Sequence, residues 1–351
     1  MNYVTRPRLV VLDGLRGVAA VVVLIAHTLA KLRWPAFPSM LAVDLFFMIS
    51  GFVIPFAYEE QLKSGLSAAR FAMIRFVRLY PLYILGVALG LIPHIIWAWY
   101  EGVWRLRIPL VEWLLPWGLL LLPKPVPEPE HSFMLNPAAW SLFLECVVNA
   151  LYVLVLPYLT LRLLGVIVGA SAVTLAIAAS LFGGLNFGTG GWELTWGLAR
   201  AGCPFAIGVL VYRLWQMRRL PDWQFSTLLA PVLFLLTLAL PTGLTSWAVV
   251  VFFFLVWVAV QSSPGRRATQ VFTWLGDLSY TLYMVHYAVL LTVQTAGLKE
   301  GLPNTALLLG AFPMTFVVAA VAGRWYNRRA RTILVGRFGL RRERVEATRA
   351  L

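Results

Sequence analysis

The sequence has few charged residues for its length. Of its 351 residues, 13% are charged and 60% are hydrophobic, and the mean hydropathy is +0.79. Soluble globular domains have about 25% charged residues, so this composition excludes a soluble globular protein. We therefore expect an integral membrane protein, for which the lipid bilayer is the solvent.

Metal-binding and disulfide patterns are missing as well. The two cysteines, Cys146 and Cys203, lie in apolar surroundings without a CxxC or Cys/His spacing, so they indicate neither a zinc site nor a disulfide framework. We predict no metal and no bound cofactor. The net charge of +14 would suit a nucleic-acid-binding protein, but the basic residues cluster in short segments between apolar stretches, without a basic face that has interleaved aromatic residues. We therefore predict no nucleic-acid partner.

Long apolar segments make up most of the chain. Ten of them have roughly the length that crosses a bilayer, about 20 residues. An eleventh, at residues 113–122, is short and bracketed by prolines, and we interpret it as a re-entrant or interfacial segment. The predicted fold is an all-α integral membrane bundle of about ten transmembrane helices, with residues 1–351 as a single domain. The predicted spans are residues 9–31, 38–58, 76–99, 140–156, 160–182, 198–215, 225–240, 244–260, 272–296 and 304–326.

The distribution of Lys and Arg predicts how these spans are oriented. With ten spans and a cytoplasmic N-terminus, every strongly basic segment falls on the cytoplasmic side, including an Arg-rich tail at residues 327–351. Both termini are then cytoplasmic. The stretch at residues 100–139 lies outside, and its proline-rich part, residues 123–137, is predicted to be a stiff extended loop.

Ionisable residues inside the spans are candidate functional residues, because a charge at the centre of the bilayer is costly. Arg16 and His27 are 11 residues apart in the first span, a spacing that returns to nearly the same helix face. Arg16 then lies about 16 Å nearer the cytoplasm than His27. Asp13 would form a local ion pair with Arg16 or take part in function. For His27 by itself, a solvated position at the outer boundary is the simpler interpretation.

Asp44 and Glu145 are predicted to lie at the depth of His27. Asp44 is about six residues, or roughly 9 Å, inside the outer end of its span, and Glu145 is at a similar depth. A histidine with a carboxylate that fixes its tautomer is the minimum set for general-base catalysis. The alternative is a structural polar cluster that ties helices together.

Two further groups of residues share a helix face. Ser279, Tyr283 and His286 form one stripe in the ninth span, which is typical of interhelical hydrogen bonds and is also suited to substrate binding. Arg75 and Arg78 are three residues apart at the start of the third span. Arginine favours bidentate phosphate contacts, and the alternative for this pair is anchoring to lipid headgroups.

Five ordered motifs in this chain resemble the acyltransferase 3 family of ten-span membrane acyltransferases. Together they are specific, whereas each alone would be weak, and they span nearly the whole chain. In that family, the Arg and His of the first motif are associated with activity, and the RxxR pair of the third with the acyl-CoA donor. The motifs are LDGLRGVAAVVVLIAH at residues 12–27, VDLFFMISGF at 43–52, RFVRLYPLY at 75–83, WSLFLE at 140–145 and GDLSYTLYMVH at 276–286.

The resemblance implies an enzyme of the bacterial cytoplasmic membrane. It implies transfer of an acyl group, acetyl in the first instance, from cytoplasmic acyl-CoA to a hydroxyl of an extracytoplasmic or lipid-linked carbohydrate. Many relatives carry a soluble SGNH-type domain after the last span, and this chain resembles the stand-alone form. Whether the histidine acts as a base or carries the acyl group is left open, as is the carboxylate that orients it. The predicted catalytic residues are His27, Glu145 and Asp44, and the predicted substrate-binding residues are Arg16, Arg75, Arg78, Ser50, Tyr283 and His286.

A transporter or flippase of a glycan or a lipid-linked precursor is the alternative function. Buried charges would then line a transport path. This alternative predicts broken spans in corresponding halves of the chain, and the sequence has no such pair of spans.

Overall fold

The computed structural model describes residues 8–34, 37–125 and 132–340, and the regular elements in these ranges are helices. This confirms the predicted all-α class. Seven of the helices are long and apolar enough to cross a membrane. The helices are α1 (Val10–Lys31), α2 (Met40–Lys63), α3 (Ala68–Glu101), α4 (Trp104–Leu120), α5 (Ala139–Val155), α6 (Leu161–Phe182), α7 (Glu193–Gln216), α8 (Leu229–Thr237), α9 (Ala248–Gln261), α10 (Arg266–Lys299), α11 (Asn304–Val321) and α12 (Arg328–Arg337).

Most predicted spans coincide with one helix each. The exceptions lie at the seventh and eighth spans, where α8 and α9 are shorter than the apolar stretches that contain them, because Thr242–Trp247 forms a 3-10 helix between them. At the end of the chain, Ala322–Asn327 is a π-helical turn that joins α11 to α12, so the last span runs on into the start of the predicted Arg-rich tail. Residues 341–351 of that tail lie outside the described residues.

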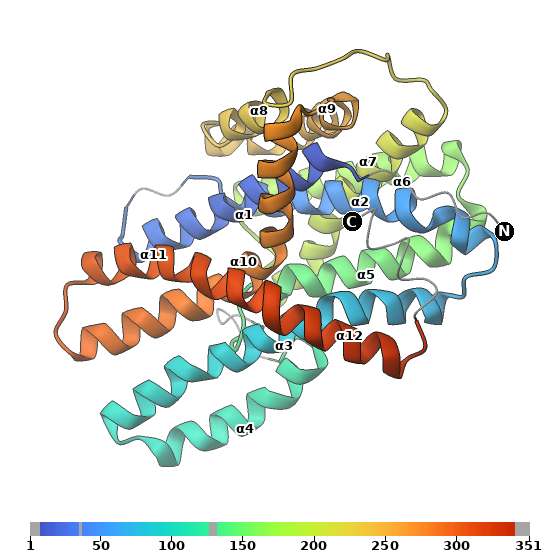
Figure 1. Cartoon of the computed structure of the whole chain (residues 1–351). Coiled ribbons are helices and arrows are strands. Elements are labelled where there is room, and N and C mark those ends of the chain that lie inside the picture. Colours follow the sequence, from blue (N-terminus) through green and yellow to red (C-terminus); the bar gives the residue numbers. More distant parts are fainter. Residues whose placement is uncertain (1–7, 35–36, 126–131, 341–351) are drawn as a thin grey trace.

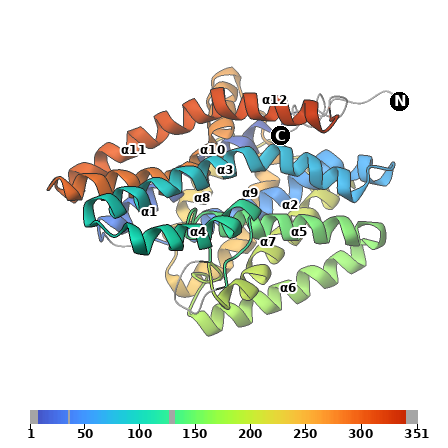
Figure 2. The ribbon, with the colours of Figure 1, turned by 90° about the horizontal axis from the view of Figure 1, so that it is seen from below.

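The eleventh apolar segment forms a longer helix than predicted. We expected only residues 113–122, but α4 has 17 residues and contains Pro109 and Pro116. Its last turn is attached to α3, because the hydroxyl of Tyr80 donates to the carbonyl of Leu119 at 2.8 Å and that of Tyr83 donates to the carbonyl of Gly118. Figures 1 and 2 show α4 beside α3 at the edge of the bundle. These two hydrogen bonds satisfy carbonyls that the C-terminal end of a helix leaves without an intrahelical partner.

Glycines allow α1 and α10 to pack closely against each other. A Cβ atom on Gly17 would lie 2.4 Å from the Cβ of Leu275, and a Cβ atom on Gly276 would lie 2.6 Å from the Cβ of Asp13. Gly14 has a similar position against Phe272. Small residues of this kind let helix backbones approach closely in membranes. The two helices are therefore held in a fixed register along this contact.

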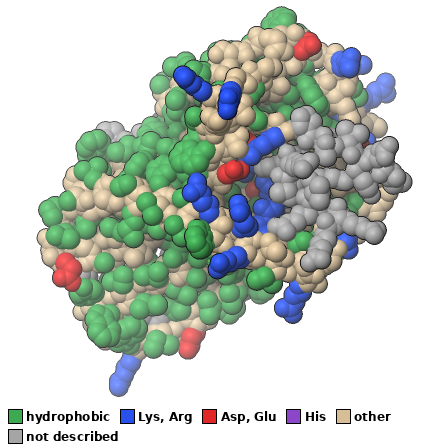
Figure 3. Space-filling view, in the orientation of Figure 1, with side chains coloured by type: hydrophobic (Ala, Val, Ile, Leu, Met, Phe, Trp, Pro, Cys, Tyr) green, Lys and Arg blue, Asp and Glu red, His purple; other side chains and the backbone are tan. Residues whose placement is uncertain are grey.

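Basic side chains gather toward one end of the bundle. Glu59 of α2 forms ion pairs with Lys63 of the same helix and with Arg213 of α7. Arg70, at the start of α3, donates a hydrogen bond to the carbonyl of Gly339, which follows α12. We call the end that carries these contacts the basic end. In Figure 3, the Lys and Arg side chains gather on the side of α12, whereas much of the remaining face is hydrophobic.

The opposite end is held by polar contacts of another kind. Lys31 at the end of α1 donates to Gln294 of α10, at 3.0 Å. The carbonyl of the same lysine accepts a hydrogen bond from Asn304, the first residue of α11, also at 3.0 Å. Helices α1 and α10 therefore run in the same direction, from the basic end to this opposite end.

We expect Gly17→Ala to destabilise the protein, because the added methyl group would meet backbone atoms of α10. Gly310→Ala in α11 is the matched control, since nothing lies within 4 Å of the added Cβ there. Overpacking costs about 1 to 3 kcal/mol, so the melting temperature in detergent should fall for the first variant and stay unchanged for the second. Equal melting temperatures would show that α1 and α10 are not closely packed.

Candidate active site

A cavity of about 80 Å³ lies inside the bundle, enclosed by α1, α2, α3, α5 and α10. The structure brings together in its wall most of the residues that the sequence marked as functional. His27, Asp44 and His286 are not part of this wall. The predicted site residues that line the cavity are Arg16, Ser50, Arg75, Arg78, Glu145 and Tyr283.

Three arginines and one carboxylate meet in the part of the cavity nearest the basic end. Arg75 is buried, and its Nη2 donates to Oε1 of Glu145 at 2.7 Å. The hydroxyl of Ser50 donates to the same oxygen at 3.0 Å. Arg16 and Arg78 line the cavity beside this group. Positive charge therefore exceeds negative charge among these side chains, which suits an anionic group with several oxygens.

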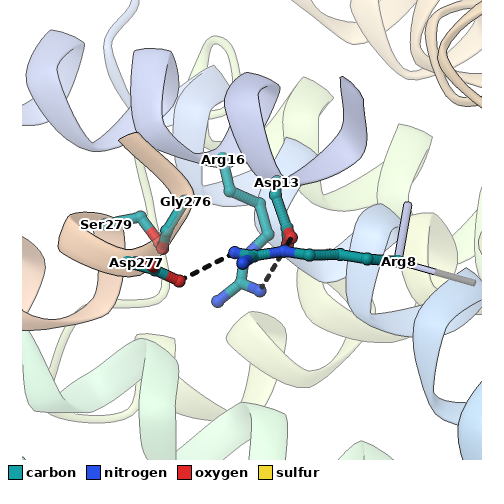
Figure 4. Close-up of polar contacts among 6 residues, drawn as sticks. All are labelled: Arg8, Asp13, Arg16, Gly276, Asp277 and Ser279. Atoms are coloured by element: carbon teal, nitrogen blue, oxygen red, sulfur yellow. Dashed lines mark hydrogen bonds and ion pairs between the residues drawn. The ribbon is translucent and has the colours of Figure 1, made fainter. Parts of the chain in front are cut away.

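A second polar network joins the first turn of α1 to Asp277 of α10 (Figure 4). The Nε of Arg8 donates to Oδ2 of Asp13 at 2.5 Å, and its Nη2 donates to Oδ1 of Asp277 at 2.7 Å. Arg16 is a more distant partner of Asp13, with 3.8 Å between Nη1 and Oδ1. Asp13 thus forms an ion pair with Arg16, as one of the two interpretations expected, but Arg8 is its closer partner. Figure 4 shows the side chain of Arg8, which precedes α1, pointing toward Asp13 and Asp277.

The sequence analysis predicted that Glu145 lies beside His27. In the structure Glu145 contacts Arg75 instead. The prediction placed the start of the fourth span at the outer surface, but the segment before α5 enters the bundle. Leu135 and Asn136 are buried, and the amide of Asn136 donates to the carbonyl of Met284 in α10 at 3.2 Å. Because α5 begins in the interior, Glu145 lies nearer the basic end. The described part of the predicted proline-rich loop is therefore partly buried, and residues 126–131 lie outside the described residues.

Asp44 forms an ion pair with Arg200 and not with His27, its predicted partner. Its Oδ1 accepts from Nε of Arg200 at 2.8 Å, and its Oδ2 accepts from Nη2 at 3.2 Å. Arg200 of α7 is fully buried, donates to the carbonyls of Phe187 and Met40, and lies over the ring of Trp140. Equal depth in the membrane was not sufficient to predict a contact between Asp44 and His27, because side chains at one depth can point toward different neighbouring helices. The pair ties α2 to α7.

Arg200 is the residue that the sequence analysis missed. It lies inside the predicted span at residues 198–215, where an arginine is a candidate functional or structural residue by default. The missing step was to pair it with a carboxylate in another span. Its complete burial and its contacts with four other residues identify it as a clamp between helices.

His27 lies against His286, with 4.9 Å between the ring centroids. The Nδ1 of His27 is 3.0 Å from the carbonyl of Val23, one turn earlier in α1. A carbonyl can only accept a hydrogen bond, so Nδ1 carries the proton and Nε2 carries the lone pair of the neutral ring. A backbone carbonyl therefore fixes the tautomer that we expected a carboxylate to fix.

Tyr283 lies between the cavity and the two histidines. Its hydroxyl is 2.8 Å from that of Ser141. Its ring is 5.5 Å from the ring of Phe46 and 5.7 Å from that of His286, measured between centroids. Tyr283 and Phe46 line the cavity, whereas the histidines do not. Tyr283 therefore contacts both the cavity and His286.

Three or more His, Cys, Asp or Glu side chains do not converge as a metal site anywhere in the described ranges. The groups available for chemistry in the site include the arginines and Glu145 in the cavity, the serine and tyrosine hydroxyls that line it, and the two imidazoles nearby.

We expect Arg200→Met to destabilise the protein, because it leaves the carboxylate of Asp44 buried without its partner. Removing one member of a buried ion pair costs about 3 to 5 kcal/mol, which should lower the melting temperature strongly. The double variant Asp44→Asn/Arg200→Met should recover part of the loss, since no unpaired charge remains. If Asp44→Asn alone kept its stability but lost turnover by more than tenfold, a catalytic role for Asp44 would have to be restored.

Comparisons with known proteins bear on the family of this chain. A family model described as an acyltransferase domain, of the acyltransferase 3 type, matches residues 9–324. The chain is 38% identical over 191 residues to a protein of Rhizobium radiobacter named "Protein 2 in picA locus", which covers 50% of this chain and 96% of that relative. No solved structure matches. Because the family model spans nearly the whole described chain, this protein belongs to the acyltransferase 3 family of membrane acyltransferases.

Proposed function

We propose that this acyltransferase takes an acyl group from a cytoplasmic acyl-CoA and transfers it to a hydroxyl of a carbohydrate at the other side of the membrane. The observation that carries the proposal is the arrangement along α1. Arg16 lines the cavity toward the basic end, and His27 lies beyond the far end of the cavity. The 11 residues between them correspond to about 16 Å along the helix axis. An extended donor would have its phosphates at one end of this path and its thioester toward the other.

The cationic part of the cavity supports an anionic donor. Arg75 and Arg78 project from one face of α3, and Arg16 joins them from α1. Glu145 and Ser50 hold the guanidinium of Arg75 in place through one carboxylate oxygen. The phosphates of acyl-CoA would then bind to guanidinium groups whose positions are set before the donor arrives. The clustering of basic residues at this end supports its assignment to the cytoplasm, with both termini there.

The route from the cavity to the histidines passes Tyr283 and Phe46. Their rings contact each other and line the cavity. The hydrogen bond between Tyr283 and Ser141 holds the tyrosine in that position. We infer that the acyl end of the donor displaces the Tyr283 side chain when it advances toward His27. In this account Tyr283 contacts the donor, in keeping with its predicted place among the substrate-binding residues.

His27 would act as the general base of the transfer. The lone pair on its Nε2 takes the proton of the acceptor hydroxyl, and the oxygen attacks the thioester carbonyl. A new C–O bond forms, the C–S bond breaks, and the sulfur of CoA receives a proton. The hydrogen bond from Nδ1 to Val23 keeps the ring in the tautomer that this step needs.

The acyl group and the acceptor class rest on the family. Members of the acyltransferase 3 family that this chain resembles modify carbohydrates, and acetyl is the acyl group that we propose here. The acceptor would be a sugar hydroxyl on an exported or lipid-linked glycan, and the membrane would be the bacterial cytoplasmic membrane.

We expect Arg78→Ala and Arg75→Ala to weaken donor binding more than acceptor use. Loss of one charge-assisted phosphate contact costs about 1.5 to 3 kcal/mol, or roughly 10- to 150-fold in affinity for acetyl-CoA. Arg70→Ala is the matched control, because Arg70 is an exposed arginine on the same helix that contacts Gly339 and not the cavity. An unchanged dissociation constant in the first two variants would assign these arginines to lipid headgroups.

We expect His27→Ala to lower turnover by about 10²- to 10⁴-fold, the range that general-base catalysis contributes. Affinity for acetyl-CoA should persist, because the phosphates bind at the far end of the path. His94→Ala serves as a control, since His94 is on α3 and does not line the cavity. Melting temperature and transfer rate are measured together on purified protein. A folded His27→Ala variant with more than about a tenth of the normal rate would rule out the base.

A further inference from the structure

His286 is a buried histidine that takes no part in the proton transfer proposed for His27. It lies on α10, is 1% exposed, and meets the ring of His27 with an angle of 48° between the planes. The two residues come from the two helices that the glycine contacts hold together, and they lie at the same level along that contact. Their proximity is therefore a fixed feature of the fold.

The tautomer of His286 follows from its backbone contact. Its Nδ1 is 2.7 Å from the carbonyl of Tyr283, which can only accept a hydrogen bond. Nδ1 therefore carries the proton, and Nε2 of the neutral ring carries a lone pair. That Nε2 is buried and has no hydrogen-bond partner among the residues that the structure describes. The fold thus buries a nitrogen that can accept a hydrogen bond, on a ring that lies next to His27.

A purely structural role does not explain this nitrogen. Buried polar atoms are normally paired, and an unpaired one is costly. A phenylalanine would fill the same space and contact His27 without burying an unpaired acceptor. The free-energy cost of burying this unpaired acceptor is explained if Nε2 gains a hydrogen-bond donor during the reaction. The predicted carboxylate partners cannot take this role, because Asp44 is bound to Arg200 and Glu145 to Arg75.

We propose that His286 is a positioning residue of the acyl transfer, whose Nε2 accepts a hydrogen bond from His27 once His27 has become protonated. This inference rests on the proposed function of His27. When His27 takes the proton of the acceptor hydroxyl, its Nε2 becomes a donor, and the Nε2 of His286 is the nearby acceptor. The hydrogen bond stabilises the imidazolium and orients the ring until the proton passes to the sulfur of CoA. No proton is gained or lost by His286 in this cycle.

Three substitutions of His286 separate the acceptor nitrogen from the shape of the ring. His286→Phe keeps a ring but has no nitrogen, and His286→Asn keeps a donor for the carbonyl of Tyr283 but has no acceptor at the Nε2 position. His286→Gln places an amide oxygen near that position and restores an acceptor. Transfer from labelled acetyl-CoA to extracted glycan is measured in proteoliposomes, together with the melting temperature and the KM for acetyl-CoA.

We expect the Phe and Asn variants to lower kcat by about 10- to 100-fold, as for loss of one hydrogen bond to a charged group. The KM for acetyl-CoA should be unchanged, and the Gln variant should recover at least severalfold of the loss. A structural role would instead lower the melting temperature and leave kcat per folded molecule intact. A folded Phe variant that keeps more than a third of kcat would overturn the proposal, as would a Gln variant that is as slow as the Phe variant.

The double variant His27→Ala/His286→Phe tests whether the two histidines act together. If they do, it should be no more than about threefold slower than His27→Ala alone, because His286 acts only through His27. Losses that multiply would assign His286 an independent role and contradict the proposal. His27→Ala, measured in parallel, distinguishes the two hypotheses. If that variant remains fully active, the proposed function fails, whereas a slow His27→Ala beside a fully active His286→Phe sinks the inference about His286 alone.

Discussion

The close contact between α1 and α10 is the constraint on which the site depends. Gly17 and Gly276 leave no room for a Cβ atom between the two helices, so the helices run side by side in one register. At the basic end this register brings Asp13 of α1 and Asp277 of α10 within reach of Arg8. At the opposite end it brings together the two histidines. One packing contact therefore aligns both ends of the proposed path for acyl transfer.

The buried charged side chains of the bundle mainly form ion pairs with one another. Arg200 and Asp44 clamp α7 to α2, and Arg75 and Glu145 join α3 to α5. Each of the two histidines is instead oriented by a carbonyl of its own helix. This division follows from the low dielectric of the interior, where an unpaired charge is far more costly than a neutral imidazole. In the proposed path, the histidine end thus has neutral groups at rest, whereas the cationic end is suited to an anionic ligand.

The hydropathy of the sequence was sufficient to predict most of the helices. The first predicted span, residues 9–31, differs from α1 by one residue, because about 20 apolar residues have few alternatives to a membrane helix. Helix periodicity placed Arg75 and Arg78 on one helix face, and both side chains line the same cavity. The motifs of the acyltransferase 3 family indicated the family that the whole-chain match then confirmed.

The partners of the carboxylates could not be predicted from depth alone. Depth leaves the direction of a side chain around its helix undetermined, so Asp44 was placed near His27 when it faces Arg200. For Glu145, depth itself was wrong, because the segment that contains Leu135 and Asn136 is buried and α5 starts in the interior. Polar and proline-rich sequence before a span resembles an external loop. Only the packing of that segment against Gly86 and Gly90 of α3 shows that it is inside.

The central claim is that an acyl group passes from the basic end of the bundle to the histidine end. It is tested most directly in sealed vesicles whose protein orientation is known, with labelled acetyl-CoA added on the side of the basic end. An acceptor glycan is either enclosed in the lumen or added outside with the donor. The account predicts that label accumulates on the enclosed glycan and that the vesicles stay impermeable to acetyl-CoA. Label found only on glycan added to the same side as acetyl-CoA would contradict it.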